Sequence, residues 1–419
     1  MKTTALRIYG KNDLRLEVFD LPEMGEDEIL AEVVTNSICM SCHKAAAQGA
    51  DHKRVPNDVA VHPTMIGHEF AGRLVKVGKK WAGQFKAGDL FSIQPALGYK
   101  GTLDAPGYSF RWIGGNATYV LIPSCVMEMN CLLPYAGEGF FKASLSEPMS
   151  CIVGAAHAQY HTRYGNYTHD MGIVKGGTCA ILAGAGPMGM GCIDYLVNGP
   201  LQPRLLVVTD IDDARINRAA ELMTVAHAKT RGVTLVYKNT KTMPDPVGSL
   251  KEMAGGGFDD VFVFAPVAPV VEQADAILGR NGCLNFFAGP TDTTFSAKFN
   301  FYNVHYAETH IVGTSGGNTD DMRESLQLMS EGKINPAAMI THVGGLTAAK
   351  DTTLRLPEIP GGKKLIYTHF DFPLIAISDL IKSENPFFAE LGKICARHDN
   401  LWNVEAEKLL MKNGPTLKI

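Results

Sequence analysis

The chain has 419 residues, of which 46% are apolar and 20% are charged, and its formal net charge is -4. This length exceeds one compact core, so we expect at least two folding units. The composition is typical of a globular protein, and the slight negative charge argues against nucleic acid as a partner and favours a small molecule.

No charged N-terminal segment leads into an apolar stretch, and no uninterrupted run reaches the roughly 20 apolar residues that a membrane-spanning helix requires. The nine cysteines are odd in number and unevenly spaced, which does not resemble the disulfide framework of a small secreted domain. We therefore expect a cytoplasmic protein without a membrane partner, whose cysteines are mostly buried thiols.

Short β-type segments, broken by glycine and proline, run through the first 150 residues. The candidate strands are 28–34, 72–77, 89–93 and 117–122. This pattern predicts an all-β, barrel-like unit.

The pattern changes after Glu147, where an alanine-rich segment through His157 looks helical. Apolar strands then alternate with helical patterns. The candidate strands are 178–183, 205–209, 233–237, 260–264, 283–287 and 309–313. The alternation predicts a parallel, doubly wound α/β sheet with right-handed crossovers.

A helix is expected over 321–331, and the later candidates are β-like segments at 341–343 and 357–367 and helices at 389–397 and 405–412. The return of β-like segments indicates that the first domain is discontinuous. We expect three parts, namely 1–152 with 318–375, then 153–317, and a helical extension over 376–419.

A glycine fingerprint, G-x-G-x-x-G, joins the end of the strand at 178–183 to a helical pattern. Gly184 suits the tight turn, Gly186 lets the backbone approach a pyrophosphate, and Gly189 allows close packing of helix and strand. Pro187 and Met188 complete the turn. The alternative is a glycine-rich turn in an α/β protein that binds no nucleotide, but strand, turn, helix and terminal acid occur in the expected order.

That terminal acid is Asp210, which ends the second strand about 20 residues after the glycines, where a carboxylate accepts hydrogen bonds from the ribose hydroxyls. It would repel a 2′-phosphate, which favours NAD(H) over NADP(H). NADP(H) is not excluded, because Arg215 could turn toward a phosphate.

Three residues offer one zinc donor of each common kind: the thiol of Cys39, the imidazole of His68 and the carboxylate of Glu69. Taken alone, Cys39 is better interpreted as a buried, inert thiol. His68 and Glu69 could likewise be a solvated pair of polar side chains. Gly67 and Gly72 change this interpretation, because they imply a bent backbone that presents adjacent polar side chains.

With these motifs the chain resembles the zinc-dependent medium-chain dehydrogenases. The resemblance covers roughly residues 1 to 370 and rests on the G-H-E-x-x-G-x5-G signature through Gly78, on 88–89, 114–119 and 147–148, and on the glycine fingerprint. It implies a GroES-like catalytic domain and a Rossmann domain, with zinc and a nicotinamide cofactor.

Within that family, Cys39, His68 and Glu69 match the zinc ligands of the sorbitol-dehydrogenase-like polyol branch. Glu147 matches the carboxylate that holds the zinc-bound water or ligates the metal. Many members carry a second, structural zinc on four cysteines, but 94–112 contains none, so one zinc per chain is expected.

The residues after Cys39 depart from the family pattern. Ser41 matches the proton-relay hydroxyl, and His43 could extend the relay or be a surface histidine. Cys42 stands where an aspartate usually orients the ligand histidine, so another group must hold His68. Cys42 forms C-x-x-C with Cys39, which leaves direct zinc binding by Cys42 as an alternative.

The segment 356–371 resembles the L-sorbose-1-phosphate reductases, a group in this superfamily that interconverts a ketose phosphate and a hexitol phosphate. A phosphorylated substrate needs a cation, and Lys44 or Arg111 could supply one, although each alone reads better as a solvated surface charge. The alternatives are a dehydrogenase of an unphosphorylated polyol or an L-threonine-type alcohol, and a non-catalytic relative. The resemblance also implies a homodimer or homotetramer joined through 309–313.

Overall fold

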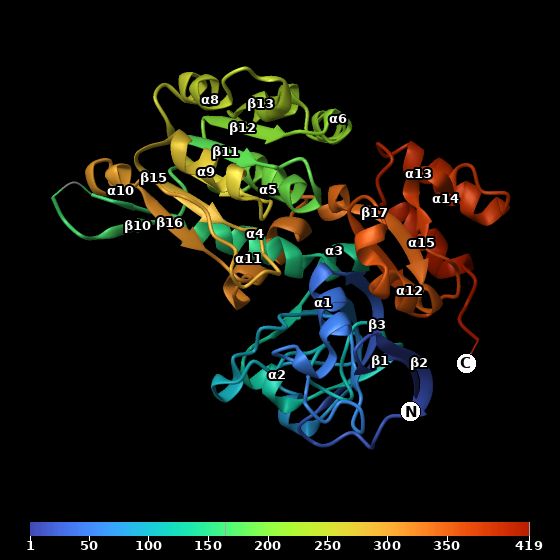
Figure 1. Cartoon of the computed structure of the whole chain (residues 1–419). Helices are drawn as coiled ribbons and strands as arrows, with labels where there is room; N and C mark the ends of the chain where they lie inside the picture. The colour runs from blue at the N-terminus through green and yellow to red at the C-terminus, as the bar shows by residue number, and fades with distance from the viewer. Residues whose placement is uncertain (164, 419) are drawn as a thin grey trace. The chain divides into compact units, whose positions relative to one another are not determined.

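The computed structural model describes residues 1–163 and 165–418. The chain divides into two compact units (Figure 1). Unit 1 comprises Met1–Glu147, Met329–Glu331 and Pro336–Ile419, and unit 2 comprises Pro148–Leu328 and Gly332–Asn335. The segment 376–419, for which the sequence suggested a separate extension, is therefore part of unit 1.

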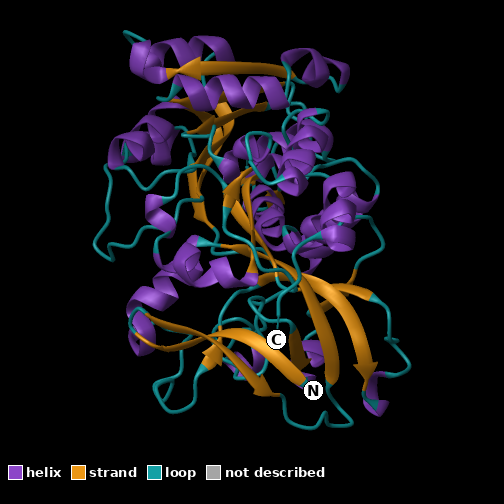
Figure 2. Cartoon of the chain, turned by 90° about the vertical axis from the view of Figure 1, so that its right-hand side faces the viewer, coloured by secondary structure: helices purple, strands orange, loops and turns teal. Residues whose placement is uncertain are grey.

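Unit 1 is built on a mixed sheet with the strand order β19-β17-β18-β3-β5-β6-β8, in which β7 also pairs with β3. Figure 2 shows the strands of the chain in orange and the helices in purple. These strands are β3 (Ile29–Ile38), β5 (Glu69–Val77), β6 (Leu90–Ile93), β7 (Tyr119–Ile122), β8 (Leu132–Pro134), β17 (Ile340–Gly345), β18 (Lys363–Tyr367) and β19 (Ile375–Ala376). A second sheet has the order β2-β1-β4, from β1 (Lys2–Gly10), β2 (Asp13–Asp20) and β4 (Thr64–Met65).

In the larger sheet of unit 1, the paired strands β3 and β5 approach each other closely at Gly72. A side chain at Gly72 would place its Cβ only 1.8 Å from the backbone oxygen of Glu32. The pairing register also shifts between Val33 and Thr35. Glycine in a strand marks such a close approach, and here it lets the two strands that end at the polar site pair.

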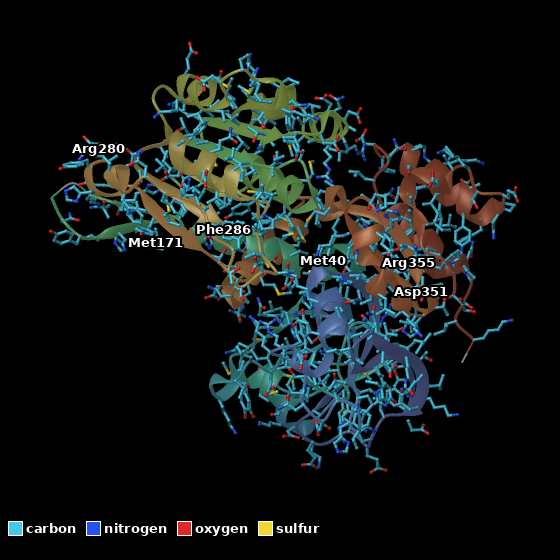
Figure 3. The ribbon with its side chains drawn as sticks, viewed as in Figure 1. Met40, Met171, Arg280, Phe286, Asp351 and Arg355 are labelled. Atoms are coloured by element: carbon cyan, nitrogen blue, oxygen red, sulfur yellow. The ribbon has the colours of Figure 1, made fainter. Side chains whose placement is uncertain are left out.

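The helices of unit 1 cover its sheets. They are α1 (Met40–Gln48), α2 (Ser124–Glu128), α3 (Phe140–Ser144), α12 (Ala349–Leu354), α13 (Ile377–Leu380), α14 (Pro386–Ala396) and α15 (Val404–Asn413). Helix α1, which begins at Met40, packs against α12, on which Asp351 lies (Figure 3). Short 3₁₀ segments lie at Gly49–Asp51, Lys79–Trp81, Tyr99–Gly101, Pro336–Met339, Leu346–Ala348 and Leu356–Glu358.

The C-terminal helices join unit 1 through a buried core of their own. Trp402 is fully buried, and its indole N–H donates to the hydroxyl of Tyr367 at 2.6 Å. That hydroxyl donates in turn to Glu407 at 2.7 Å. Because Tyr367 belongs to β18, these bonds fix α15 and the loop before it to the main sheet.

Unit 2 contains the parallel sheet, ordered β13-β12-β11-β14-β15-β16. Its strands are β11 (Thr178–Leu182), β12 (Leu205–Asp210), β13 (Thr234–Asn239), β14 (Phe258–Val263), β15 (Leu278–Phe286) and β16 (His310–Gly313). The helices are α4 (Ser146–Ala158), α5 (Pro187–Asn198), α6 (Asp213–Leu222), α7 (Val225–Thr230), α8 (Pro246–Ala254), α9 (Ala268–Ile277), α10 (Phe301–Tyr306) and α11 (Thr319–Ser330), with a 3₁₀ segment at Thr240–Thr242. The predicted doubly wound sheet is confirmed.

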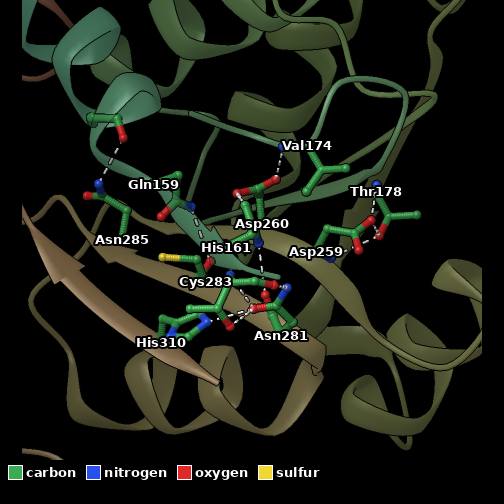
Figure 4. A network of polar contacts seen from close by, with 12 residues as sticks. Gln159, His161, Val174, Thr178, Asp259, Asp260, Asn281, Cys283, Asn285 and His310 are labelled. Atoms are coloured by element: carbon green, nitrogen blue, oxygen red, sulfur yellow. Dashed lines mark hydrogen bonds and ion pairs between the residues drawn. The ribbon is translucent and has the colours of Figure 1, made fainter. Parts of the chain in front are cut away.

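A hairpin of β9 (Tyr160–Thr162) and β10 (His169–Met171) is attached to this sheet through a buried polar network (Figure 4). His161 donates from Nδ1 to the backbone oxygen of Asn281 at 2.8 Å and from Nε2 to Asp260 at 3.2 Å. Burial disfavours its charge, but the Asp260 carboxylate raises the pKa of His161 above the ordinary value. The hairpin is thus held by a buried ion pair.

In the described part of the chain, the helices are all too short or too polar to cross a membrane.

Candidate metal centre and cofactor site

The donors selected from sequence meet at the ends of two neighbouring strands. Cys39 follows β3 and caps α1, while Glu69 begins β5 and His68 precedes it. The strands are antiparallel, with Ser37 opposite Glu69. A thiol sulfur, an imidazole nitrogen and a carboxylate oxygen therefore lie within 4.8 Å of one another. This donor set fits zinc.

Glycine is required at position 67 for this convergence. Gly67 has φ of +109°, and a Cβ there would lie 2.9 Å from the backbone nitrogen of Asn116. The turn lets consecutive residues, His68 and Glu69, face the same side of the strand end. Among residues 1–163 and 165–418, this is the one group of three or more such donors placed to hold a metal, consistent with a single zinc.

Glu69 is fully buried, and both of its oxygens are held. Ser37 donates to one oxygen and the ammonium of Lys363 donates to the other. Burial alone would raise the pKa of Glu69, but Lys363 and His68 hold it below the usual range. The carboxylate is therefore ionised and can bind a cation.

His68 is held by the residue that replaced the expected aspartate. Its Nδ1 lies 3.1 Å from Sγ of Cys42, while Nε2 lies 3.3 Å from the hydroxyl of Ser41 and 3.4 Å from that of Tyr108. Burial lowers the pKa of His68, but the sulfur of Cys42 and the nearby carboxylates outweigh it and raise the pKa to about 9. Cys42 thus contacts Nδ1, whereas Nε2 lies 4.0 Å from a carboxylate oxygen of Glu69.

Cys39 and Glu147 complete the polar cluster and are partly exposed. Burial raises the pKa of Cys39 to about 11, against the opposing effect of the Lys363 ammonium. Burial also raises the pKa of Glu147, whose charge interacts with His68 and Glu69. A metal that binds here must displace the thiol proton.

The two residues predicted to move a proton lie in α1. The Ser41 hydroxyl donates to Sγ of Cys39 at 3.2 Å. His43 donates from Nδ1 to the backbone oxygen of Thr353 at 3.0 Å, so its Nε2 is left as the acceptor. Their part in a relay stays a prediction.

The two predicted phosphate-binding cations lie in different surroundings. The charge of Lys44 acts on His52, which stacks on Tyr108 beside the metal-site histidine. The charge of Arg111 acts instead on Arg7, whose guanidinium donates to the backbone oxygen of Pro63.

The sequence reasoning missed Lys363, Tyr108, His52 and Arg54. Tyr108, His52 and Arg54 belong to no motif, and Lys363 lies in the segment 356–371, whose resemblance gave it no role. All four reach the cluster through long-range packing. A lysine in the apolar strand segment 363–367 was the single available signal, because lysine is rarely buried unless it is paired.

The glycine turn in unit 2 has the form expected for a dinucleotide. A Cβ at Gly189 would lie 1.9 Å from the backbone oxygen of Gly184, so helix α5 packs tightly on the end of β11. By contrast, nothing lies within 4 Å of a Cβ built on Gly186, which caps α5 and precedes Pro187. The space in front of this helix N-terminus suits a pyrophosphate; Met188 follows in the first turn.

Asp210 lies at the end of β12 and contacts the same turn. Its carboxylate accepts from the backbone nitrogens of Ala185 at 3.2 Å and Ile211 at 2.8 Å. Arg215 is directed toward Asp212, with 3.7 Å between Nε and the carboxylate, and its side chain is largely exposed.

A cavity of about 490 Å³ opens beside Asp210 at the carboxyl ends of the strands. Ile211, Thr240, Val247 and Pro269 contribute to its lining. Nucleotides bind outside the carboxyl ends of parallel strands, and the mainly apolar lining suits an adenine ring.

Two protein families match the two halves of this arrangement. Residues 25–130 match the alcohol dehydrogenase GroES-like domain, and residues 205–331 match the zinc-binding dehydrogenase family. These segments cover most of the polar cluster of unit 1 and much of the parallel sheet of unit 2.

Whole-chain relatives give the same result. The chain is 54% identical over 414 residues to mannitol-1-phosphate 5-dehydrogenase of Aliivibrio fischeri, with 98% of each chain covered. It is 50% identical over 412 residues to L-sorbose 1-phosphate reductase of Klebsiella pneumoniae, again with 98% of each covered.

The structure of 2R,3R-butanediol dehydrogenase from Bacillus subtilis has a similar fold, with a TM-score of 0.69 and 20% identity, covering 87% of this chain and 99% of that one. The predicted GroES-like and Rossmann architecture is thereby confirmed, and the cofactors are zinc and a nicotinamide nucleotide. The chain belongs to the polyol branch of the zinc-dependent medium-chain dehydrogenase superfamily and is an oxidoreductase of the polyol and sugar dehydrogenase type.

Proposed function

We propose that this enzyme reduces a ketose phosphate to a hexitol phosphate, and catalyses the reverse oxidation, with one zinc and NAD(H). One hydride and one proton are added to the carbonyl group, and NADH becomes NAD⁺. The observation that carries the proposal is that relatives 54% and 50% identical over nearly the whole chain are named for phosphorylated hexitols and ketoses. An L-sorbose 1-phosphate to glucitol 6-phosphate reaction is the type we expect.

In this proposal Cys39, His68 and Glu69 hold the zinc, and Glu147 binds the metal or its water. When bound, zinc polarises the substrate oxygen as a Lewis acid and the nicotinamide exchanges the hydride. Cys42 orients the ring of His68 through Nδ1, at 3.1 Å, which leaves Nε2 for the metal.

The chain's own proton path would begin at Ser41, whose hydroxyl lies within 3.3 Å of both Cys39 Sγ and His68 Nε2. His43 lies two residues further along α1, and its Nε2 is the acceptor nitrogen that would take the proton outward. The preference for NAD(H) rests on Asp210, because its carboxylate would repel a 2′-phosphate. Arg215, the cation that a 2′-phosphate of NADP(H) would need, is already paired with Asp212.

A turnover screen tests the substrate and the cofactor together. We expect the zinc-loaded enzyme to turn over L-sorbose 1-phosphate, or the reverse hexitol phosphate, with kcat/KM at least about 100-fold above that of the unphosphorylated sugar, because two charge-assisted hydrogen bonds contribute about 3 kcal/mol or more. NADH should be preferred to NADPH. Equal or better rates with sorbitol or L-threonine would contradict the proposal and support the unphosphorylated alternative.

We also propose a homodimer joined through the edge of the parallel sheet. A homotetramer that contains this contact is the alternative. In the described chain β16 ends the strand order, so its outer edge has no strand beside it. Exposed apolar side chains gather at this end, namely Ile311 on β16, Met171 on β10 (labelled in Figure 3), and Phe301, Tyr302 and Tyr306 on α10. Two copies of one edge pair antiparallel about a twofold axis.

Ile311→Lys should shift the protein toward the monomer in analytical ultracentrifugation, because it places two like charges in the paired edges. Val225→Lys gives the control, since Val225 is a similarly exposed apolar residue on α7, away from β16. A dimer unchanged in both variants would exclude this edge. None of the nine cysteines forms a disulfide, which supports the cytoplasm as the site of action.

A further inference from the structure

A buried tyrosine connects the metal-site histidine to two basic residues outside the motifs. The hydroxyl of Tyr108 lies 3.4 Å from Nε2 of His68, and the two rings are 4.8 Å apart. His52 stacks on the same tyrosine ring at 5.6 Å, nearly parallel at 11°. The guanidinium carbon of Arg54 lies 5.4 Å from the ring centroid. One aromatic ring therefore contacts both these basic groups and the imidazole of the metal site.

Arg54 has a buried guanidinium nitrogen without a hydrogen-bond partner. This atom, Nε, is fully buried, and no hydrogen bond from residues 1–163 and 165–418 satisfies it. By contrast, Arg15 and Arg163 each donate to a carboxylate. Burying a charged donor without a partner costs free energy, so this arginine is preorganised for an anion that comes from outside the chain.

His52 offers a second donor beside Arg54. Its Nδ1 accepts the backbone N–H of Arg54 at 3.3 Å, so Nε2 carries the ring proton. Burial and then the charge of Arg54 lower the pKa of His52 to about 4, with further contributions from Lys53, His68 and Lys44. The neutral ring is a donor in a strongly positive environment.

The two ends of the cluster therefore differ in charge. At the metal end the carboxylates of Glu69 and Glu147 lie with the ammonium of Lys363. At the other end Arg54 and Lys44 are positive, beside the neutral ring of His52. Burial raises the pKa of Glu147, and the charge of Arg54 is one of those that oppose this effect, so the two ends interact electrostatically. A substrate with an oxygen at one end and a dianion at the other could bind in one direction only.

We propose that Arg54 and the Nε2–H of His52 form the subsite for the phosphate group of the substrate, with the ring of Tyr108 as the spacer to the metal. This assignment rests on the proposed sugar-phosphate substrate and explains how that substrate is selected. Guanidinium binds phosphate oxygens through paired, charge-assisted hydrogen bonds. Lys44 adds long-range attraction at the same end.

The test compares Arg54→Met and Arg54→Lys with the wild type in the zinc-loaded enzyme. The measured quantity is the ratio of kcat/KM for L-sorbose 1-phosphate to kcat/KM for L-sorbose. We expect Arg54→Met to lower this ratio about 10- to 100-fold, mainly through KM, because it removes hydrogen bonds to a charged group. Arg54→Lys should recover part of this ratio, because lysine keeps the positive charge but lacks the paired N–H donors of the guanidinium.

Calorimetric binding of inorganic phosphate supplies a readout that does not depend on turnover, and it should weaken in Arg54→Met. Arg15→Met is the matched control: Arg15 also lies over a tyrosine ring, Tyr9, at 4.1 Å, but it is paired with Asp13. Its ratio and its phosphate affinity should equal those of the wild type. Zinc content and circular dichroism show whether each variant is folded.

The possible failures are distinguishable. A wild type that prefers the phosphorylated ketose, with the same preference and phosphate affinity in Arg54→Met, overturns the subsite and leaves the proposed function standing. An equal loss of turnover with both ketoses in Arg54→Met and Arg54→Lys indicates a structural role and also overturns it. A wild type that does not prefer the phosphorylated ketose refutes the proposed function, and the subsite with it.

Discussion

Cys39→Ser is expected to lose its zinc and to reduce turnover about 1,000-fold, because Lewis-acid stabilisation of the transition state is worth several kcal/mol. The serine hydroxyl is a poor substitute for a thiolate, which is the donor that zinc favours. NADH should still bind, since the turn from Gly184 to Gly189 belongs to unit 2. The measurements are zinc per chain by atomic emission, turnover, and NADH binding by fluorescence.

Cys125→Ser provides the control for this prediction. Cys125 is also a partly exposed thiol of unit 1, but it lies in α2 and belongs to no donor group among the described residues. This variant should keep zinc and activity. Stoichiometric zinc together with undiminished turnover in Cys39→Ser would remove Cys39 from the metal site.

The sequence predicts the parallel sheet well because its strands are short apolar segments separated by helical periods. Every residue of β12, for example, is buried, and a fully buried strand has a pattern that can be recognised locally. The hairpin of β9 and β10 shows the opposite case. All three residues of β10 are exposed, so no hydrophobic period marks it, and it is held by His161 and Asp260, which are 99 residues apart.

The same distinction applies to the candidate site. The donors Cys39, His68 and Glu69 could be predicted because a local glycine pattern presents them. The sequence showed that Cys42 had replaced an expected aspartate, but only the structure places its sulfur 3.1 Å from Nδ1 of His68.

Contacts between distant segments could not be predicted. Lys363 and Glu69 are 294 residues apart, and they meet because β18 pairs with β3, which pairs with β5. Arg54 and Tyr108 also lie in separate loop segments. Such contacts depend on strand pairing, which no local pattern specifies.

Lys363→Met is expected to reduce the stability of unit 1 by about 3–5 kcal/mol in the metal-free protein, because it leaves the buried carboxylate of Glu69 without its cation. Zinc should restore much of this loss, since a bound divalent cation neutralises the same carboxylate. The three tryptophans, Trp81, Trp112 and Trp402, all belong to unit 1. Urea unfolding followed by tryptophan fluorescence, with and without zinc, therefore reports on this unit.

The neighbouring lysine gives the matched control, because it is buried without a carboxylate. The ammonium of Lys364 donates to the backbone oxygens of Pro360 and Gly362 at 2.9 and 2.6 Å, and burial lowers its pKa to about 8. Lys364→Met removes a desolvated charge and leaves only neutral carbonyls unpaired, so its cost should be smaller and independent of zinc. Equal losses in the two variants, unaffected by zinc, would mean that Lys363 acts through packing and not by balancing the charge of Glu69.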